Sequence, residues 1–196
     1  MTLWDEDISL NKMPKSTELE VKPFHTTIMG AAATGETHHL LKLLEDKYKD
    51  HFNTIWLICP TFFRNETYLD WKYVNNPEFI PIPCYLHEVE YFTQLVIEAS
   101  RQYGMHKQGN KNLLILDNVA GGKSVKNRGG GLVESGFGSR HDELSVVVIA
   151  QQFKSIAKAR RDNQSHFTLF YNPNKKDMDE MFESLLVTWK KRRKKE

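Results

Sequence analysis

Short apolar runs alternate along the chain with longer segments in which apolar residues recur at helical spacing. The apolar runs predict strands at 24–29, 54–59, 79–82, 112–117, 144–150 and 166–171. The intervening patterns predict helices from about 36 to 48, 87 to 103, 132 to 137, 153 to 164, and from 175 onward. Several of the strands are apolar on both faces, which is typical of a buried parallel sheet. The alternation therefore predicts an α/β fold with a mainly parallel central sheet flanked by helices.

The chain length of 196 residues favours one domain with two flanking segments. We expect an N-terminal arm over 1–22, a domain over 23–188 and a basic tail over 189–196. No apolar run approaches the roughly 20 residues of a membrane span, and the acidic first residues do not resemble a secretory signal. Cys59 and Cys84 offer no disulfide framework, which favours a reducing intracellular compartment.

The positive charge is concentrated at the C-terminus. The net charge is +2, yet residues 190–195 are all Lys or Arg, so the 21 basic and 24 acidic residues before Lys190 leave that part at −3. The basic run fits a contact with a phosphate backbone, a nuclear-import signal or a plain solvated tail. Nothing in the composition makes the remaining chain a general nucleic-acid binder.

A glycine-bounded loop joins the first predicted strand to the first predicted helix. Its spacing, Gly30-x-x-x-x-Gly35-x-Thr37, is that of a phosphate-binding loop, in which backbone N–H groups and a helix N-terminus surround a polyphosphate. Glu36 stands where the motif has lysine. The alternative is a strand–helix turn without a ligand. The candidate phosphate-binding residues are Gly30, Ala31, Ala32, Ala33, Thr34, Gly35, Glu36 and Thr37.

A carboxylate ends the predicted strand at 112–117. The sequence Leu-Leu-Ile-Leu-Asp, ending at Asp117, has the pattern of a Walker B strand, whose carboxylate holds Mg²⁺ together with the hydroxyl of Thr37. A loop-capping aspartate is the alternative. Asn118 follows, where enzymes of this class often carry a second acid as the base for an attacking water, and an amide cannot accept that proton.

Further candidate catalytic residues surround the strand at 144–150. Gln151 follows it and could orient a water or sense a γ-phosphate, or simply be a polar strand end. Arg140 precedes it and could reach a neighbouring subunit as an arginine finger, or simply be solvated. The aromatic segment 62–73 could stack on nucleic-acid bases or belong to the core. Residues that follow parallel strands share one edge of the sheet, where ligands bind.

The motifs together resemble a known family. They are the phosphate loop and Walker B strand, Ile58-Cys59-Pro60-Thr61, Asn65-x-Thr67-Tyr68-x-x-Trp71, Ser139-Arg140-His141, Ile149-Ala150-Gln151-Gln152 and Phe170-Tyr171-Asn172-Pro173-Asn174-Lys175-Lys176-Asp177. Over about residues 22–188 the chain resembles viral genome-packaging ATPases of the FtsK/HerA superfamily, found in poxvirus-like viruses, adintoviruses and Maverick/Polinton elements.

The resemblance implies a RecA-like P-loop NTPase in which the strand at 144–150 lies between the two motif strands. It implies ATP and Mg²⁺ as cofactors, with hydrolysis driving double-stranded DNA into a capsid. The implied partners are double-stranded DNA, capsid or portal-vertex proteins and further copies of the chain in a homo-oligomeric ring. The implied location is the host cytoplasm or nucleus, in a virus factory, or the virion.

Glu36 and Asn118 depart from the family pattern. A unit-charge pair about 4 Å apart is worth about 4 kcal/mol at an effective dielectric near 20, so replacing lysine by glutamate is expected to weaken nucleotide binding. We expect the Glu36 carboxylate to lie near the loop amides and partly to mimic phosphate. The missing cation could come from Lys123, Lys126 or Lys154. A non-hydrolysing structural or regulatory subunit, or a decayed copy, remains an alternative function.

Overall fold

The computed structural model describes residues 23–106, 111–119 and 143–193. Within these ranges six strands form a single sheet in the order β3-β2-β4-β5-β1-β6, and all neighbouring strands are parallel. The predicted parallel α/β architecture is confirmed. The strands are β1 (His25–Met29), β2 (Thr54–Ile58), β3 (Phe79–Ile82), β4 (Asn112–Leu116), β5 (Leu144–Ala150) and β6 (His166–Leu169).

The described helices lie between successive strands, except the last helix, which follows the last strand. They are α1 (Glu36–Asp46), α2 (Glu66–Leu69), α3 (Val89–His106), α5 (Lys158–Asp162) and α6 (Lys175–Arg193), with 3₁₀ turns η2 (Phe62–Arg64) and η4 (Phe153–Ser155). The α6 helix continues into the first four residues of the basic run at 190–195. The helix expected at 132–137 and the arm at 1–22 lie outside the described residues.

The single helix predicted over 153–164 is wrong. The segment divides into η4 and α5, with Ile156 in extended backbone between them. The Ser155 hydroxyl donates to the carbonyl of Gln152 and closes a local turn. Such side-chain bonds compete with the continuous helical ladder.

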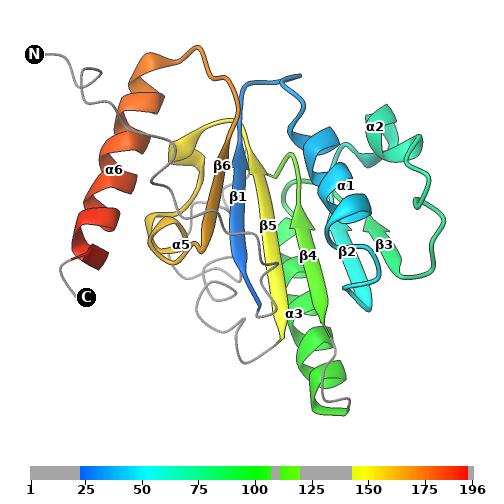
Figure 1. The fold of residues 1–196 in the computed structure, drawn as a ribbon. Helices are drawn as coiled ribbons and strands as arrows, with labels where there is room; N and C mark the ends of the chain where they lie inside the picture. The colour runs from blue at the N-terminus through cyan, green and yellow to red at the C-terminus, as the bar shows by residue number, and fades with distance from the viewer. Residues whose placement is uncertain (1–22, 107–110, 120–142, 194–196) are drawn as a thin grey trace, which may run out of the picture.

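Alternating side chains of the strands build two separate layers of core. On β2, Leu57 faces the layer that contains Leu40 and Leu44 of α1, whereas Ile58 faces the layer that contains Val96 of α3. Figure 1 shows α1 in front of the sheet and α3 behind it. A smaller cluster packs Met29 of β1 against Phe153, Met178 and Met181 at the β6 end of the sheet. The sheet is thus buried on both faces, which explains its apolar strands.

The sheet order brings the motif strands close together. The strand β5 pairs with β1 on one side and β4 on the other. This confirms the RecA-like order expected from the family resemblance. The register aligns Met29 with Ala150 and Leu116 with Val148, so the residues that follow β1, β4 and β5 meet at one edge.

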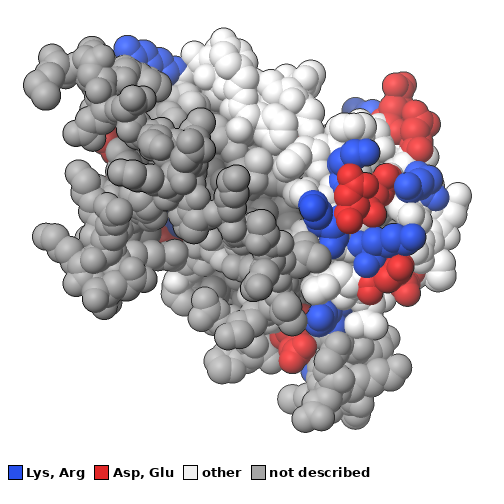
Figure 2. Space-filling model, in the orientation of Figure 1, with Lys and Arg blue, Asp and Glu red and all other residues white. Residues whose placement is uncertain are grey.

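On the face drawn in Figure 2, the described charged side chains gather mainly at the right, where both signs are mixed, while the described upper middle part is uncharged. Lys42 lies 3.7 Å from Asp46 within α1, and Lys72 lies 3.0 Å from Glu45. Cys59 is buried and Cys84 is half-buried, and both are free. Among the described residues, no helix has both the length and the apolar character to cross a membrane.

Candidate functional site

The loop between β1 and α1 is held in shape by its own backbone. The Gly30 N–H donates to the carbonyl of Ala150 at 3.3 Å, and the Ala31 N–H donates to the carbonyl of Tyr171 at 3.0 Å. The Thr34 N–H and hydroxyl both donate to the Ala31 carbonyl, at 3.2 and 2.8 Å. The loop is therefore anchored to the neighbouring strand and to the segment after β6. Its N–H groups and the start of α1 form the kind of concavity that binds anions.

The two glycines of the loop have different roles. A Cβ at Gly30 would lie 2.5 Å from Thr34 Oγ1, 2.6 Å from Phe170 Cβ and 2.7 Å from Glu36 Oε1. At Gly35 a Cβ would meet nothing within 4 Å, but φ is 98°. Gly30 is thus required for space and Gly35 for backbone conformation.

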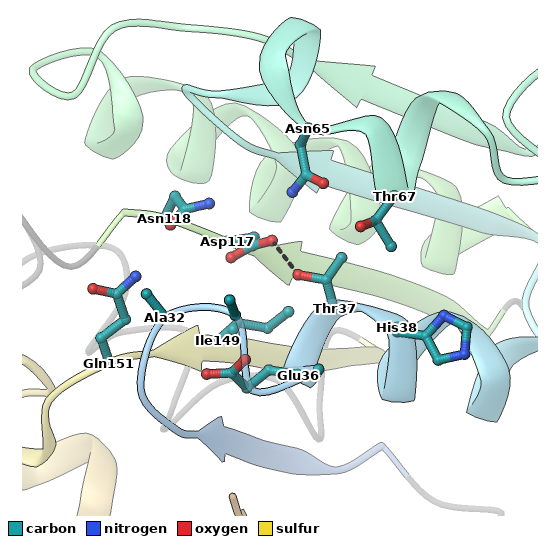
Figure 3. A pocket seen from close by; sticks show the side chains of 12 residues that line it. Ala32, Glu36, Thr37, His38, Asn65, Thr67, Asp117, Asn118, Ile149 and Gln151 are labelled. Carbon is teal, nitrogen blue, oxygen red and sulfur yellow. Dashed lines mark hydrogen bonds between the residues drawn. The ribbon is translucent and has the colours of Figure 1, made fainter. Parts of the chain in front are cut away.

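The Glu36 carboxylate lies inside the loop. Its side chain is 7% exposed, and the Gly30 contact places Oε1 against the backbone at the start of the loop. Figure 3 shows the carboxylate within the curve of the loop, below Ala32. The expected position near the loop is confirmed, whereas the mimicry of phosphate stays a prediction. A carboxylate in this position adds negative charge where a triphosphate would need positive charge.

Asp117 occupies the opposite side of the same cavity. Its Oδ2 accepts hydrogen bonds from the Thr37 hydroxyl at 3.2 Å and from the Tyr68 hydroxyl at 2.8 Å. Burial raises the pKa of Asp117, and the charge of Glu36 adds to the rise, while the Tyr68 and Thr37 hydrogen bonds lower it. Burial and the charge of Asp117 raise the pKa of Tyr68 well above its usual range. Asp117 and Thr37 together offer oxygen ligands of the type that Mg²⁺ prefers.

The cavity, of about 480 Å³, gathers residues from the ends of β1, β4 and β5 and from the segment after β2. Ala32, Ala33, Gly35, Glu36, Thr37, Asp117, Asn118 and Gln151 line it, as the sequence predicted for one sheet edge. Gly30, Ala31 and Thr34 support the loop without lining the cavity. Arg140 lies outside the described residues.

The described residues that line the cavity include two carboxylates and no lysine or arginine. Lys154 forms an ion pair with Glu180 at 2.7 Å, so it is engaged elsewhere. Lys123 and Lys126 lie outside the described residues. The cavity as described therefore favours cations more than a bare polyphosphate.

Asn118 and Gln151 differ in how they are held. Asn118 has a φ of 56°, and its Nδ2 donates to Thr61 Oγ1 at 3.0 Å. The Gln151 side chain is exposed and points toward the cavity in Figure 3, and its backbone carbonyl accepts a 3.5 Å hydrogen bond from Asn172.

Besides the apolar Ile149, sequence reasoning missed four residues at the site. His38, Asn65 and Thr67 line the cavity, and Tyr68 supports Asp117 from behind it. The spacing Asn65-x-Thr67-Tyr68 was an available signal, but its aromatic residue fitted either base stacking or the core. Within 62–73 the core interpretation is confirmed for Phe62, Tyr68 and Trp71, which are buried, while Phe63 is 72% exposed.

Comparison with solved structures confirms the fold. The DNA-packaging ATPase B204 of Sulfolobus Turreted Icosahedral Virus matches with a TM-score of 0.64 at 11% identity, covering 83% of each chain. B204 of Sulfolobus turreted icosahedral virus 2, in complex with ATP-gammaS, matches with a TM-score of 0.63 at 12% identity, covering 85% of each chain. At this identity the likeness establishes the P-loop ATPase fold alone.

Sequence comparison identifies poxvirus relatives. The DNA packaging protein OPG160 of Variola virus is 27% identical over 171 residues, and so is that of Vaccinia virus strain Western Reserve. The match covers 87% of this chain and 61% of either relative, so the chain spans less than two thirds of their length. The model of the family described as "Poxvirus A32 protein" matches residues 12–195. With nearly its whole length matched, the chain belongs to the poxvirus A32 protein family.

Proposed function

We propose that this chain is a DNA-packaging ATPase-like protein that binds ATP with Mg²⁺ weakly and couples the nucleotide to movement of double-stranded DNA into a capsid. The observation that carries the proposal is the 3.2 Å contact between the Thr37 hydroxyl and the Asp117 carboxylate, beside the loop at 30–37. In P-loop NTPases these two groups hold the magnesium of the bound nucleotide.

The residues present fit a magnesium ion. Within the described ranges no group of three His, Cys, Asp or Glu is arranged to hold a metal. Magnesium bound with a nucleotide needs no such group, because it keeps several waters and takes one or two protein oxygens besides the phosphates. Thr37 and Asp117 are the proposed ligands, and the ion would neutralise charge on the phosphates.

The residues fit a triphosphate less well. The backbone of the loop retains the concavity for an anion, but Glu36 places a carboxylate against it. We propose that this carboxylate partly takes the place of a phosphate group and that nucleotide binding is weak for this reason. A basic side chain from outside the described residues, or from a neighbouring subunit, would restore the balance; Arg140 is the candidate for such a contact in trans.

Gln151 and Asn118 occupy the two remaining positions of the proposed catalytic set, and only Gln151 has a side chain suited to its role. Gln151 lies at the end of β5 and lines the cavity, so its amide is suited to orienting a water or sensing a γ-phosphate. Asn118 occupies the place of the second Walker B acid and cannot serve as a base. Slow hydrolysis is therefore expected from this chain, even with nucleotide bound.

The proposed partners follow from the relatives that are named DNA packaging proteins. We propose that the chain acts on double-stranded DNA, meets capsid or portal-vertex proteins, and forms a homo-oligomeric ring. A location in the virus factory of the host cell, in the cytoplasm or nucleus, or in the virion accompanies this function.

A second candidate is a non-hydrolysing structural or regulatory subunit with the same fold. Two observations favour it. Glu36 lies within the phosphate loop, and the place of the second Walker B acid is taken by Asn118, whose amide donates a hydrogen bond to Thr61. Such a subunit would retain the oligomer surface and the metal ligands without turnover.

The test is a Mg²⁺-dependent ATPase assay with and without double-stranded DNA. It compares the wild type, Glu36→Lys/Asn118→Asp, and the same double variant carrying Asp117→Asn. DNA-stimulated turnover by the wild type supports a working motor. Turnover by the double variant alone supports the non-hydrolysing subunit. If both lack turnover and neither binds nucleotide, the proposal is overturned.

A further inference from the structure

We infer that Tyr68 is a positioning residue for the divalent cation, because its buried hydroxyl fixes the Asp117 carboxylate in the orientation that presents its other oxygen to the cavity. This inference rests on the proposed metal site at Thr37 and Asp117. Tyr68 itself does not line the cavity. It acts through Asp117.

The geometry behind the inference is a shared acceptor. The hydroxyls of Tyr68 and Thr37 both donate to Oδ2 of Asp117, at 2.8 and 3.2 Å. Figure 3 shows the other carboxylate oxygen turned away from Thr37, toward the interior of the cavity. With Oδ2 held by two donors, rotation of the carboxylate would break both hydrogen bonds.

Burial distinguishes the two donors. Tyr68 is 0% exposed, so its hydroxyl has no water to turn to and is held on Asp117. Thr37 lines the cavity, so its oxygen remains available to a cation. Of these two hydroxyls, only that of Tyr68 can therefore fix the carboxylate without also being a ligand, and the backbone N–H of Asn118 supports the same carboxylate. Hydrogen-bond partners of metal ligands typically change metal affinity by about 10- to 100-fold when they are removed.

Tyr68 also connects the wall of the cavity to its metal ligand. It belongs to α2, and its N–H donates to the carbonyl of Asn65 at 3.0 Å. Asn65 and Thr67, which both precede it in sequence, line the cavity. The hydroxyl thus ties the segment that carries these two polar side chains to the end of β4.

A second attachment of the same segment provides a matched control. The Trp71 indole donates to Glu45 of α1 at 2.8 Å, and Lys72 forms an ion pair with the same carboxylate at 3.0 Å. These contacts hold the segment after β2 against α1, and neither involves Asp117. Glu45→Ala therefore loosens the segment without touching the metal ligand.

The experiment measures Mn²⁺ affinity by electron paramagnetic resonance, with and without a non-hydrolysable ATP analogue, in wild type, Tyr68→Phe and Glu45→Ala. Tyr68→Phe is expected to bind Mn²⁺ about 10- to 100-fold more weakly. Glu45→Ala is expected to unfold at lower temperature with unchanged Mn²⁺ affinity. In an Asp117→Asn background, Tyr68→Phe is expected to add no further loss, because its effect passes through that carboxylate.

Three results would overturn the inference: Mn²⁺ affinity of Tyr68→Phe within twofold of wild type, an equal loss in Glu45→Ala, or a wild type that takes up no Mn²⁺ under either condition. A crystal structure of Tyr68→Phe gives a second readout, with the Asp117 carboxylate expected in a rotated conformer. Mn²⁺ uptake without any binding of the nucleotide analogue would instead overturn the proposed function and leave this inference standing.

Discussion

The two sides of the cavity fit different parts of the proposed nucleotide site. On one side, Asp117 and Thr37 lie in contact with their hydrogen-bond partner behind them, and the chemistry suits a magnesium ion. On the other side, the loop at 30–37 has the backbone of a phosphate site, but Glu36 reverses its charge. Backbone shape and side-chain charge are therefore separable properties of this loop.

Shape and charge are separable because the side chain at position 36, where the motif has lysine, takes no part in the hydrogen bonds that hold the loop. Those bonds join Gly30 to Ala150, Ala31 to Tyr171, and Thr34 to Ala31. None of them involves the side chain at position 36. A change of charge at Glu36 can thus leave the loop folded while altering what it binds.

The largest expected effect comes from Glu36→Lys, which restores an attractive charge to the loop. Replacing repulsion by attraction at about 4 Å is worth several kcal/mol before screening, so affinity for Mg²⁺-ATP should rise by about 100-fold. Isothermal titration calorimetry in low and high salt measures it, and the gain should shrink as salt rises.

Asp46→Lys is the control for that experiment, because it makes the same charge change at the exposed end of the same helix. Nucleotide affinity should change little in this variant. Equal gains in both variants would mean that overall charge, and not the local position of Glu36, governs binding. Unchanged nucleotide affinity in Glu36→Lys would contradict the proposal that the negative charge of Glu36 weakens binding.

Gly30→Ala tests the packing on which the loop shape depends. The new methyl group would meet Thr34, Phe170 and Glu36 at 2.5 to 2.7 Å, so the variant should lose roughly 1–3 kcal/mol of unfolding free energy. Urea denaturation measures the loss. Adding Glu36→Ala should recover part of it by removing one of the three contacts. Full additivity of the two changes would show that the carboxylate does not press against Gly30.

Gly35→Ala tests the backbone rather than the packing. Its Cβ would lie in open space, but a φ of 98° is unfavourable for an L-residue, and a cost of about 1–2 kcal/mol is expected. Gly35→Asn should cost less, because asparagine tolerates left-handed backbone better. Equal losses in the two variants would contradict a purely conformational role for Gly35.

The sequence pattern predicted the fold, and it predicted that the loop at 30–37, Asp117 and Gln151 share one edge of the sheet. Both predictions have physical reasons. Strands buried on both faces are apolar throughout, so β2, β4 and β5 stand out, and residues after parallel strands share an edge. The pattern could not place Tyr68, because a buried aromatic residue that packs and one that also donates to Asp117 look alike in sequence. It also missed the break at Ser155, where a side-chain hydrogen bond overrides helical spacing.

Asn118→Asp has the smallest expected effect, which is a change in the free energy of unfolding. The backbone of Asn118 is left-handed, which aspartate also tolerates, and the Thr61 hydroxyl could donate to the new carboxylate in place of the present 3.0 Å bond from Nδ2. The unfolding free energy should change by only about 0.5 kcal/mol.

Asn118→Ala loses both the hydrogen bond and the backbone preference, and should cost about 1–2 kcal/mol. Equal losses would mean that the new carboxylate gains nothing from Thr61, whose hydroxyl lies 3.5 Å from the Cys59 sulfur, or that repulsion from Asp117 cancels that gain. An acid at position 118 would then lack a stabilising partner, so Glu36→Lys/Asn118→Asp would be a less stable protein in which to test hydrolysis.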